Sequence, residues 1–196
     1  TGSTGDGFRL AKRLGHTITP LKPSLVGLSV KEKVVLDWQG VSLKNVEISL
    51  YENKSLKETM FGEMIFTHFG ISGPIILTIS NTALLMLEKK SEISICIDLK
   101  PALTKKQLDE RFLREFKIMG SKIFKNYLTN ILPSKMIAGF IKLSGIKADK
   151  KICHITKVER SKIIELLKSF GLTITGGRPI SEAIVTSGGI SINEIN

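Results

Sequence analysis

The 196-residue chain contains only two cysteines, Cys96 and Cys153, too few for a disulfide framework or for the paired ligand spacing of a zinc site. Glycine (17) and proline (6) occur at ordinary levels, which excludes collagen-like and low-complexity chains. No apolar run approaches the roughly 20 residues of a membrane-spanning helix, so we expect no membrane partner. The start of the sequence carries neither an initiator Met nor a secretion signal. We therefore interpret the chain as a piece of a longer, cytoplasmic protein.

Several catalytic motifs are also missing. The sequence has no GxSxG nucleophile elbow, no HExxH pair, no phosphate loop of the form GxxxxGK[ST] and no dinucleotide fingerprint GxGxxG. These absences argue against a stand-alone hydrolase and against a metalloenzyme, and we expect no metal site.

Positive charge is present in excess and is concentrated in one segment. The chain has 29 Lys and Arg against 18 Asp and Glu, a net charge of +11. Residues 100–170 hold 17 of the basic and 6 of the acidic residues, so this segment accounts for the whole excess. The remainder of the chain, with 12 of each sign, is neutral.

The basic segment also carries helical signals. Capping-box patterns at Thr104 to Gln107 and Thr156 to Glu159 each open an amphipathic run. Between them lie two shorter apolar patterns separated by Pro133. We predict a basic helical subdomain of about four helices over residues 100–170. The apolar face of its last helix is predicted to comprise Val158, Ile163, Leu166, Leu167 and Phe170.

Outside this segment, alternating β-branched residues predict strands at residues 34–38, 46–51 and 93–99. Strand character returns at residues 172–174 and 183–186, whereas Ser72-Gly-Pro74 predicts a helix start. The fold class is thus α+β: a small antiparallel β-barrel-like domain over residues 16–99 and 171–186, with the helical subdomain 100–170 inserted into it.

Glycines in the opening loop, TGSTGDG, run straight into a helix over residues 8–14 with an apolar face at Phe8, Leu10, Ala11 and Leu14. Backbone amides at such a helix start can bind an anion such as a cofactor phosphate. Asp6 would repel an anion, however, and we interpret Asp6 as the N-cap residue of the helix. On this evidence alone a purely structural loop is the favoured interpretation.

A second motif, Phe66-Thr-His-Phe-Gly-Ile-Ser-Gly-Pro74, places hydroxyls, glycines and a histidine between a strand and a helix start. Such positions commonly contact substrates. His68 could serve as a general acid or a hydrogen-bond donor, with Thr67 and Ser72 facing the same ligand. The alternative is a structural histidine, which is the commoner case.

Taken together, these motifs resemble the inserted domain of the bacterial FAD-containing NAD(P)/FAD-dependent oxidoreductases, the family of aminoacetone oxidase and a bile-acid intermediate reductase. The resemblance is carried by the TGSTGDG loop with its helix, the phrase from Gly62 to Pro74, and the closing segment Val185-Thr-Ser-Gly-Gly-Ile190 followed by Glu194-Ile195. Where the family has Val after the double glycine, this chain has Ile190.

The resemblance implies that residues 1–15 and 187–196 are stubs of an FAD domain of the same parent chain, with Gly5, Gly7, Gly188 and Gly189 as cofactor-binding residues there. It also implies that the insert covers the flavin and shapes the pocket for a small-molecule substrate. The family's dinucleotide fingerprint is absent from this segment, so we expect the fragment alone to be inactive and to hold no FAD.

Two other functions stay open. The basic segment could make the chain a nucleic-acid-binding module, although lysines that solvate outer helix faces are the commoner case and we do not expect nucleic acid as a partner. A scaffold that mediates self-association is the third possibility. The sequence identifies neither the substrate nor the choice between NADH and NADPH.

Overall fold

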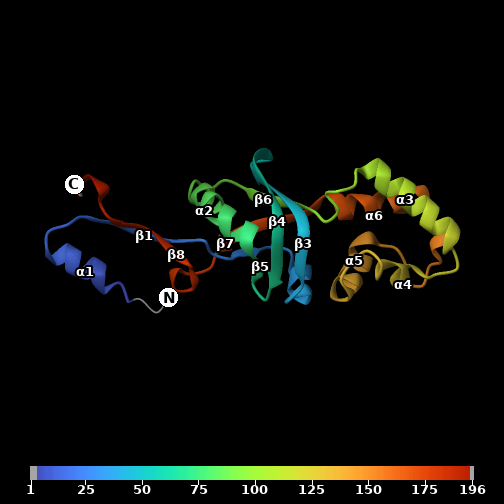
Figure 1. The fold of residues 1–196 in the computed structure, drawn as a ribbon, viewed down its shortest axis with the longest axis horizontal. Helices are drawn as coiled ribbons and strands as arrows, with labels where there is room; N and C mark the ends of the chain where they lie inside the picture. Colours follow the sequence, from blue (N-terminus) through green and yellow to red (C-terminus); the bar gives the residue numbers. More distant parts are fainter. Residues whose placement is uncertain (1–3, 195–196) are drawn as a thin grey trace.

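The computed structural model describes residues 4–194, in which six antiparallel strands close into a barrel in the order β2-β5-β4-β3-β6-β7 (Figure 1). This confirms the predicted α+β fold with a small antiparallel barrel. The strands are β2 (Leu28–Val30), β3 (Ser42–Glu52), β4 (Ser55–Thr67), β5 (Gly70–Ser72), β6 (Ile93–Asp98) and β7 (Phe170–Gly177).

Alternation of apolar residues explains why these segments form barrel strands. In β6, Ile93, Ile95 and Ile97 are buried, whereas the residues between them are only partly covered. Successive side chains of a strand point to opposite faces, so one face of β6 lines the barrel core. The strands predicted at residues 46–51 and 93–99 are confirmed within β3 and β6.

Helix α2 (Pro74–Glu88) packs against the barrel, mainly against β4, and also contacts β3, β5, β6 and β7. The helix start predicted after Ser72 is confirmed, because Pro74 occupies the first turn, where its missing N–H breaks no helical hydrogen bond. Ile75, Ile76 and Ile79 of this helix are buried.

A two-stranded ribbon extends from one end of the barrel (Figure 1). Strand β1 (Ile18–Ser24) pairs antiparallel with β8 (Val185–Ile190), and α1 (Asp6–Arg13) lies beside them. Short 3-10 turns, η4 (Ile180–Glu182) and η5 (Ile192–Glu194), flank β8. The predicted boundary at residue 16 precedes β1, and the one after residue 186 falls within β8. Strands β1 and β8 pair with each other and not with the barrel strands.

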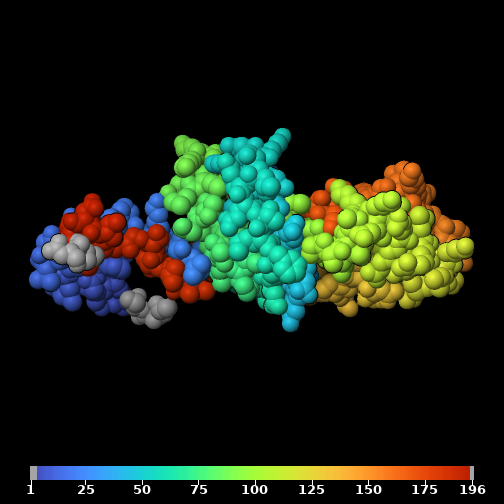
Figure 2. Space-filling model, turned by 45° about the horizontal axis from the view of Figure 1, so that its top comes forward, coloured from blue at the N-terminus to red at the C-terminus, as the bar shows by residue number. Residues whose placement is uncertain are grey.

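The helical unit forms a separate lobe at the opposite end of the molecule (Figure 2). The side chain of Thr104 and that of Thr156 each close the predicted capping box, with Gln107 and Glu159 respectively. The helices are α3 (Lys105–Ile118), α4 (Phe124–Leu128), α5 (Ile137–Ser144) and α6 (Lys157–Lys168), with 3-10 turns η2 (Ser134–Met136) and η3 (Ile152–His154).

Three local predictions are wrong. Residues 34–38 form a 3-10 helix, η1 (Lys33–Trp38), in which Val35 and Trp38 are buried at the three-residue spacing that a 3-10 turn places on one face. Val158 is 79% exposed, and Phe170 is the first residue of β7 and not part of α6. A short apolar run cannot by itself distinguish a strand from a helical turn, because both can bury it.

Trp38 joins the barrel core to the helical unit. Its ring lies 5.1 Å from the ring of Phe66 in β4 and 5.2 Å from that of Phe170 in β7. On the helical side, a Cβ added at Gly139 of α5 would lie only 2.8 Å from Trp38 Nε1, so the helix backbone approaches the indole directly. The buried residues of both parts therefore form one continuous core.

We expect Gly70→Ala to destabilise the chain by at least about 2 kcal/mol. Gly70 has φ 150°, and an added Cβ would lie 2.4 Å from the backbone oxygen of Leu28, so the β2–β5 pairing would have to move. Gly171→Ala is the matched control, because nothing lies within 4 Å of its Cβ position. Urea unfolding of both variants measures the difference, and equal midpoints would contradict this account.

Candidate functional site

The glycine loop at the start of the described chain presents its backbone in a left-handed turn. Gly5, with φ 76°, is the N-cap residue of α1, and Asp6 is the first residue inside the helix, so the expected N-cap role of Asp6 is wrong. The Asp6 carboxylate instead accepts hydrogen bonds from Arg9 and from the Thr4 hydroxyl, and these lower the pKa of Asp6. The carboxylate at this helix start is thus partly neutralised by Arg9.

The apolar face expected on α1 is only partly covered. Ala11 is buried and Phe8 is half-buried, but Leu10 and Leu14 are 58% and 81% exposed. The ribbon alone therefore covers only one edge of this helix.

Gly188 and Gly189 have a steric role in the ribbon. A Cβ at Gly188, where φ is 91°, would lie 2.3 Å from the backbone oxygen of Pro20. A Cβ at Gly189 would lie 3.1 Å from the ring of Phe8, which packs from α1 against β8. The Thr19 hydroxyl donates to the Gly189 carbonyl and accepts from its amide, both at 3.0 Å. Gly188 therefore lets β8 approach β1 closely, and Gly189 lets Phe8 of α1 pack against β8.

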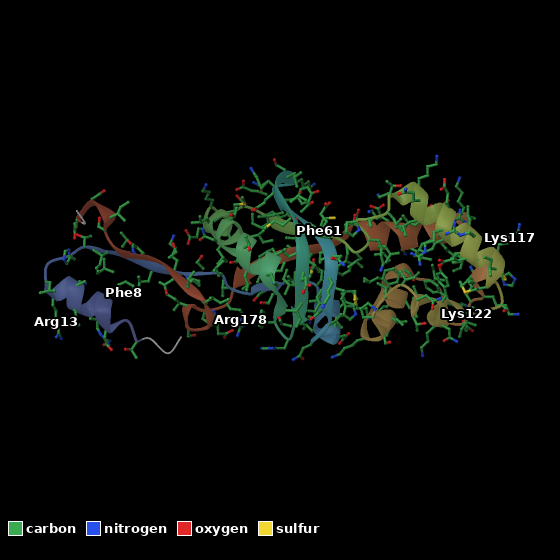
Figure 3. All side chains as sticks on the ribbon, in the orientation of Figure 1. Phe8, Arg13, Phe61, Lys117, Lys122 and Arg178 are labelled. Carbon is green, nitrogen blue, oxygen red and sulfur yellow. The ribbon has the colours of Figure 1, made fainter. Side chains whose placement is uncertain are left out.

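A cavity of about 600 Å³ opens between the glycine loop and the segment that leads into β8. Its size falls within the range of small-molecule and cofactor pockets. Figure 3 shows Phe8 on the side of α1 that faces the ribbon. The lining combines apolar side chains with hydroxyls: Thr4, Gly5, Phe8, Leu21, Ile180, Ser181, Ala183, Ile184, Val185 and Thr186.

The predicted FTHFGISGP motif forms the tight connection between β4 and β5. His68 lies exposed on the turn, with its ring edge-on to Phe69 at 5.0 Å. The Thr67 hydroxyl is buried and has no hydrogen-bond partner among residues 4–194. Thr67 pairs with Gly70, and Ser72 pairs with Ile65, so both side chains share the face of the β4–β5 pair opposite to the buried Phe66 and Ile71.

Arg178 holds the next segment against this turn. Its Nε and Nη2 donate to the Glu182 carboxylate at 2.8 and 2.6 Å, and its guanidinium lies 4.6 Å from the centre of the Phe69 ring. The Arg178 guanidinium lowers the pKa of Glu182. The Phe69 ring also packs against Gly27, where a side chain would not fit because a Cβ at residue 27 would lie 2.7 Å from the ring.

The structure therefore brings His68 together with Phe69, Arg178 and Glu182, which we name the turn cluster. Segment 178–186 runs from this cluster to the cavity, where Ile180 and Ser181 form part of the wall. Figure 3 shows Arg178 where the ribbon meets the barrel. Sequence reasoning missed the role of Arg178 and of residues 179–182, where Gly176-Gly-Arg-Pro179 indicates only a turn.

The predicted site residues thus fall into two groups. Gly5 lines the cavity, Gly7 lies next to it in α1, and a Cβ at Gly7 would meet nothing within 4 Å. His68 belongs to the turn cluster, whereas Ser72 is not among its contacts. Residues 1–3 of the glycine loop and Ile195 of the closing segment lie outside the described residues.

Residues 4–194 contain neither a cluster of metal-ligating side chains nor a helix that could cross a membrane. No three side chains of His, Cys, Asp or Glu are arranged to hold a metal ion in this range. None of the helices there combines the length and the apolar character needed to cross a bilayer.

A family model described as the HI0933-like protein barrel and H2TH domain matches residues 22–185. The match begins in β1 and ends where β8 begins. It therefore spans the barrel and the helical unit together.

Curated proteins similar to this chain carry two different names. A 3-dehydro-bile acid delta(4,6)-reductase of Clostridium scindens is 29% identical over 99% of this chain and 47% of its own length. Ribosomal RNA dihydrouridine synthases of Haemophilus influenzae and Escherichia coli are 29% and 26% identical over 100% of this chain, which covers 45% and 46% of their lengths. The chain thus spans about half the length of these relatives.

We expect Arg178→Ala to loosen segment 178–186 without unfolding the barrel. The substitution removes both hydrogen bonds to Glu182 and the contact with the Phe69 ring, so the amide of Ile184, which donates to Leu25, should exchange its hydrogen several-fold faster.

Hydrogen exchange followed by NMR measures this change. Arg9→Ala is the control, because it removes a different arginine–carboxylate pair, Arg9–Asp6 in α1, and should leave the Ile184 amide unchanged. Equal exchange rates at Ile184 in the wild type and Arg178→Ala would contradict the role given to Arg178.

Proposed function

This chain belongs to the HI0933-like barrel and H2TH family, and on that premise we propose that it is the substrate-covering insert of a flavin-dependent oxidoreductase. The observation that carries the proposal is the position of the cavity. It lies between the glycine loop and segment 178–186, and the same segment holds the turn that carries His68.

The relatives' names suggest the type of reaction. A delta(4,6)-reductase and a dihydrouridine synthase both add hydrogen to carbon–carbon double bonds, one in a bile acid and one in a uracil ring. We propose the same type of reduction for the parent of this chain. The hydride would come from NADH or NADPH.

FAD is the cofactor that fits this proposal, because it takes a hydride from a reduced nicotinamide and passes it to an organic substrate. In this chain Thr4, Gly5 and Gly7 would approach the cofactor through backbone and hydroxyl groups, since the space beside Gly7 is open. Asp6 disfavours a phosphate at this helix start, so these residues suit the neutral part of the cofactor better. Gly188 and Gly189 would act by shaping the ribbon.

The barrel end would exclude water from the reacting atoms. Phe69, held between Gly27 and the Arg178 guanidinium, gives the turn a fixed apolar face. His68 beside it can carry a proton on its imidazole, which is the second component needed when hydrogen adds across a double bond. Thr67 and Ser72 would face the substrate from the same strand pair.

The remaining groups would come from the FAD domain of the parent chain. We propose that residues 4–15 and 187–194 belong to that domain's surface, that the parent acts in the cytoplasm, and that the isolated chain neither retains FAD nor turns over substrate. Absorbance spectra of the chain and of the full-length parent, both purified without added flavin, test this. A flavin spectrum in the parent alone is expected, and no flavin in either would overturn the proposal.

In the full-length parent, we expect His68→Ala to lower turnover by about tenfold or more while bound FAD stays constant, because the imidazole would supply a proton and not hold the cofactor. Flavin absorbance measures occupancy, and NAD(P)H consumption with an acceptor measures turnover. Ser55→Ala, at an exposed residue at the opposite end of β4 from His68, is the control and should change neither. An equal loss of FAD and turnover, or no effect on either, would remove His68 from the site.

A further inference from the structure

All of the net charge sits on the helical unit. Five of its 17 basic residues are ion-paired with an acidic residue within residues 4–194: Lys105, Arg111, Lys150, Arg160 and Lys168. Four of its six acidic residues take part in these pairs. Most of the positive charge therefore has no acidic partner in the part of the chain that the structure describes.

Backbone pairing gathers a group of these lysines on one surface. The segment that leads into α4 and the loop after α5 are joined by hydrogen bonds from the amides of Phe124 and Lys125 to the carbonyls of Lys150 and Ala148. Ile123 and Lys151 form a β-bridge beside them. Two short segments with lysines on both are thus held side by side. We name Lys122, Lys125, Lys147, Lys150, Lys151 and Lys162 the lysine cluster.

Three lysines of the cluster, Lys147, Lys150 and Lys151, line a concave surface. A cavity of about 650 Å³ lies over the loop, lined by Gly145, Lys147, Asp149, Lys150, Lys151, His154 and Glu159. Gly145, with φ 69°, ends α5 and turns the chain into this loop, and its Cβ position lies 3.4 Å from Lys162 Nζ. Of the two carboxylates, Glu159 is bound by Lys150 at 2.7 Å and by the cap of α6.

The place of the cluster limits the kind of ligand. The turn cluster and the cavity beside the glycine loop lie at the ribbon end of the barrel, whereas Lys122 lies in the helical lobe at the other end of the elongated molecule (Figure 3). A small anionic substrate at the ribbon end could not contact these lysines. A polyanion long enough to span the molecule could contact both the turn cluster and the lysine cluster.

Resting on the proposed function, we propose that the lysine cluster docks the phosphodiester backbone of a folded RNA, whose reducible base is presented at the barrel. Lysines spaced along two joined segments suit a chain of phosphates, each of which releases counterions when it is neutralised. The whole of this chain is similar to 45% and 46% of the lengths of two proteins named for ribosomal RNA, which is consistent with this substrate class. The sequence alone favoured solvated helix faces; the placement of the lysines changes that balance.

The test is binding of the 196-residue chain to purified bacterial ribosomal RNA over a series of salt concentrations. The variant Lys125→Gln/Lys147→Gln/Lys151→Gln removes three exposed cluster charges. The matched control, Lys31→Gln/Lys44→Gln/Lys89→Gln, removes three exposed charges from the barrel region, so both variants have the same net charge. Circular dichroism confirms that each is folded.

We expect the cluster variant to bind about tenfold or more weakly, with the slope of log K against log salt reduced by roughly two to three. The control should stay within about twofold of the wild type. An equal loss in both variants, or no wild-type binding at physiological salt, would overturn the proposal. So would cluster-dependent binding to phosphatidylserine vesicles or heparin without binding to RNA.

Flavin reduction separates this proposal from the one that precedes it. In the full-length parent, the cluster variant should hold FAD and be reduced by NAD(P)H at the wild-type rate, because the cluster lies away from the cavity. If the full-length parent holds flavin but the 196-residue chain does not bind RNA, the docking proposal is wrong and the proposed function stands. A parent without flavin would end the proposed function.

Discussion

The double pairing of β7 is the constraint on which the rest of the molecule depends. This strand pairs with β6 on one side and with β2 on the other, and so closes the barrel. The whole helical unit lies between β6 and β7 in the sequence, so the barrel closes only after the chain has returned from it. Strands that are distant in sequence must therefore meet in register, and each pairing removes backbone groups from water at the core.

The same arrangement recurs at the other end of the barrel. Strands β1 and β8 enter and leave the barrel region as a hydrogen-bonded pair, just as β6 and β7 enter and leave the helical unit. Each inserted part is thus attached through two neighbouring antiparallel strands. Such an attachment restricts the relative movement of the parts more than a single linker would, because the two paired strands would have to separate first. This fixes the ribbon and the helical unit at opposite ends of one body (Figures 1 and 2).

The fixed arrangement explains how one small chain can contribute to two tasks. Trp38 packs against Phe66 and Phe170 in the barrel and against Gly139 in the helical unit, so the two cores are continuous. A ligand docked on the helices would therefore be held at a set distance from the turn cluster. On the proposal made here, the charged lobe binds the bulk of the substrate and the barrel end presents the reacting base.

Local chemistry made much of the fold predictable. The sequence by itself determined the capping boxes at Thr104 and Thr156, the helix start at Pro74 and the strands of alternating isoleucines, since each depends on residues close together in the chain. Only the tertiary structure decided that residues 34–38 form a 3-10 turn and that the Arg178 guanidinium reaches the Phe69 ring. It also decided that residue 188 must be glycine, because the backbone oxygen of Pro20 occupies the space that a Cβ would need. The physical reason is that these last features depend on contacts between segments far apart in sequence, which no local pattern of residues specifies.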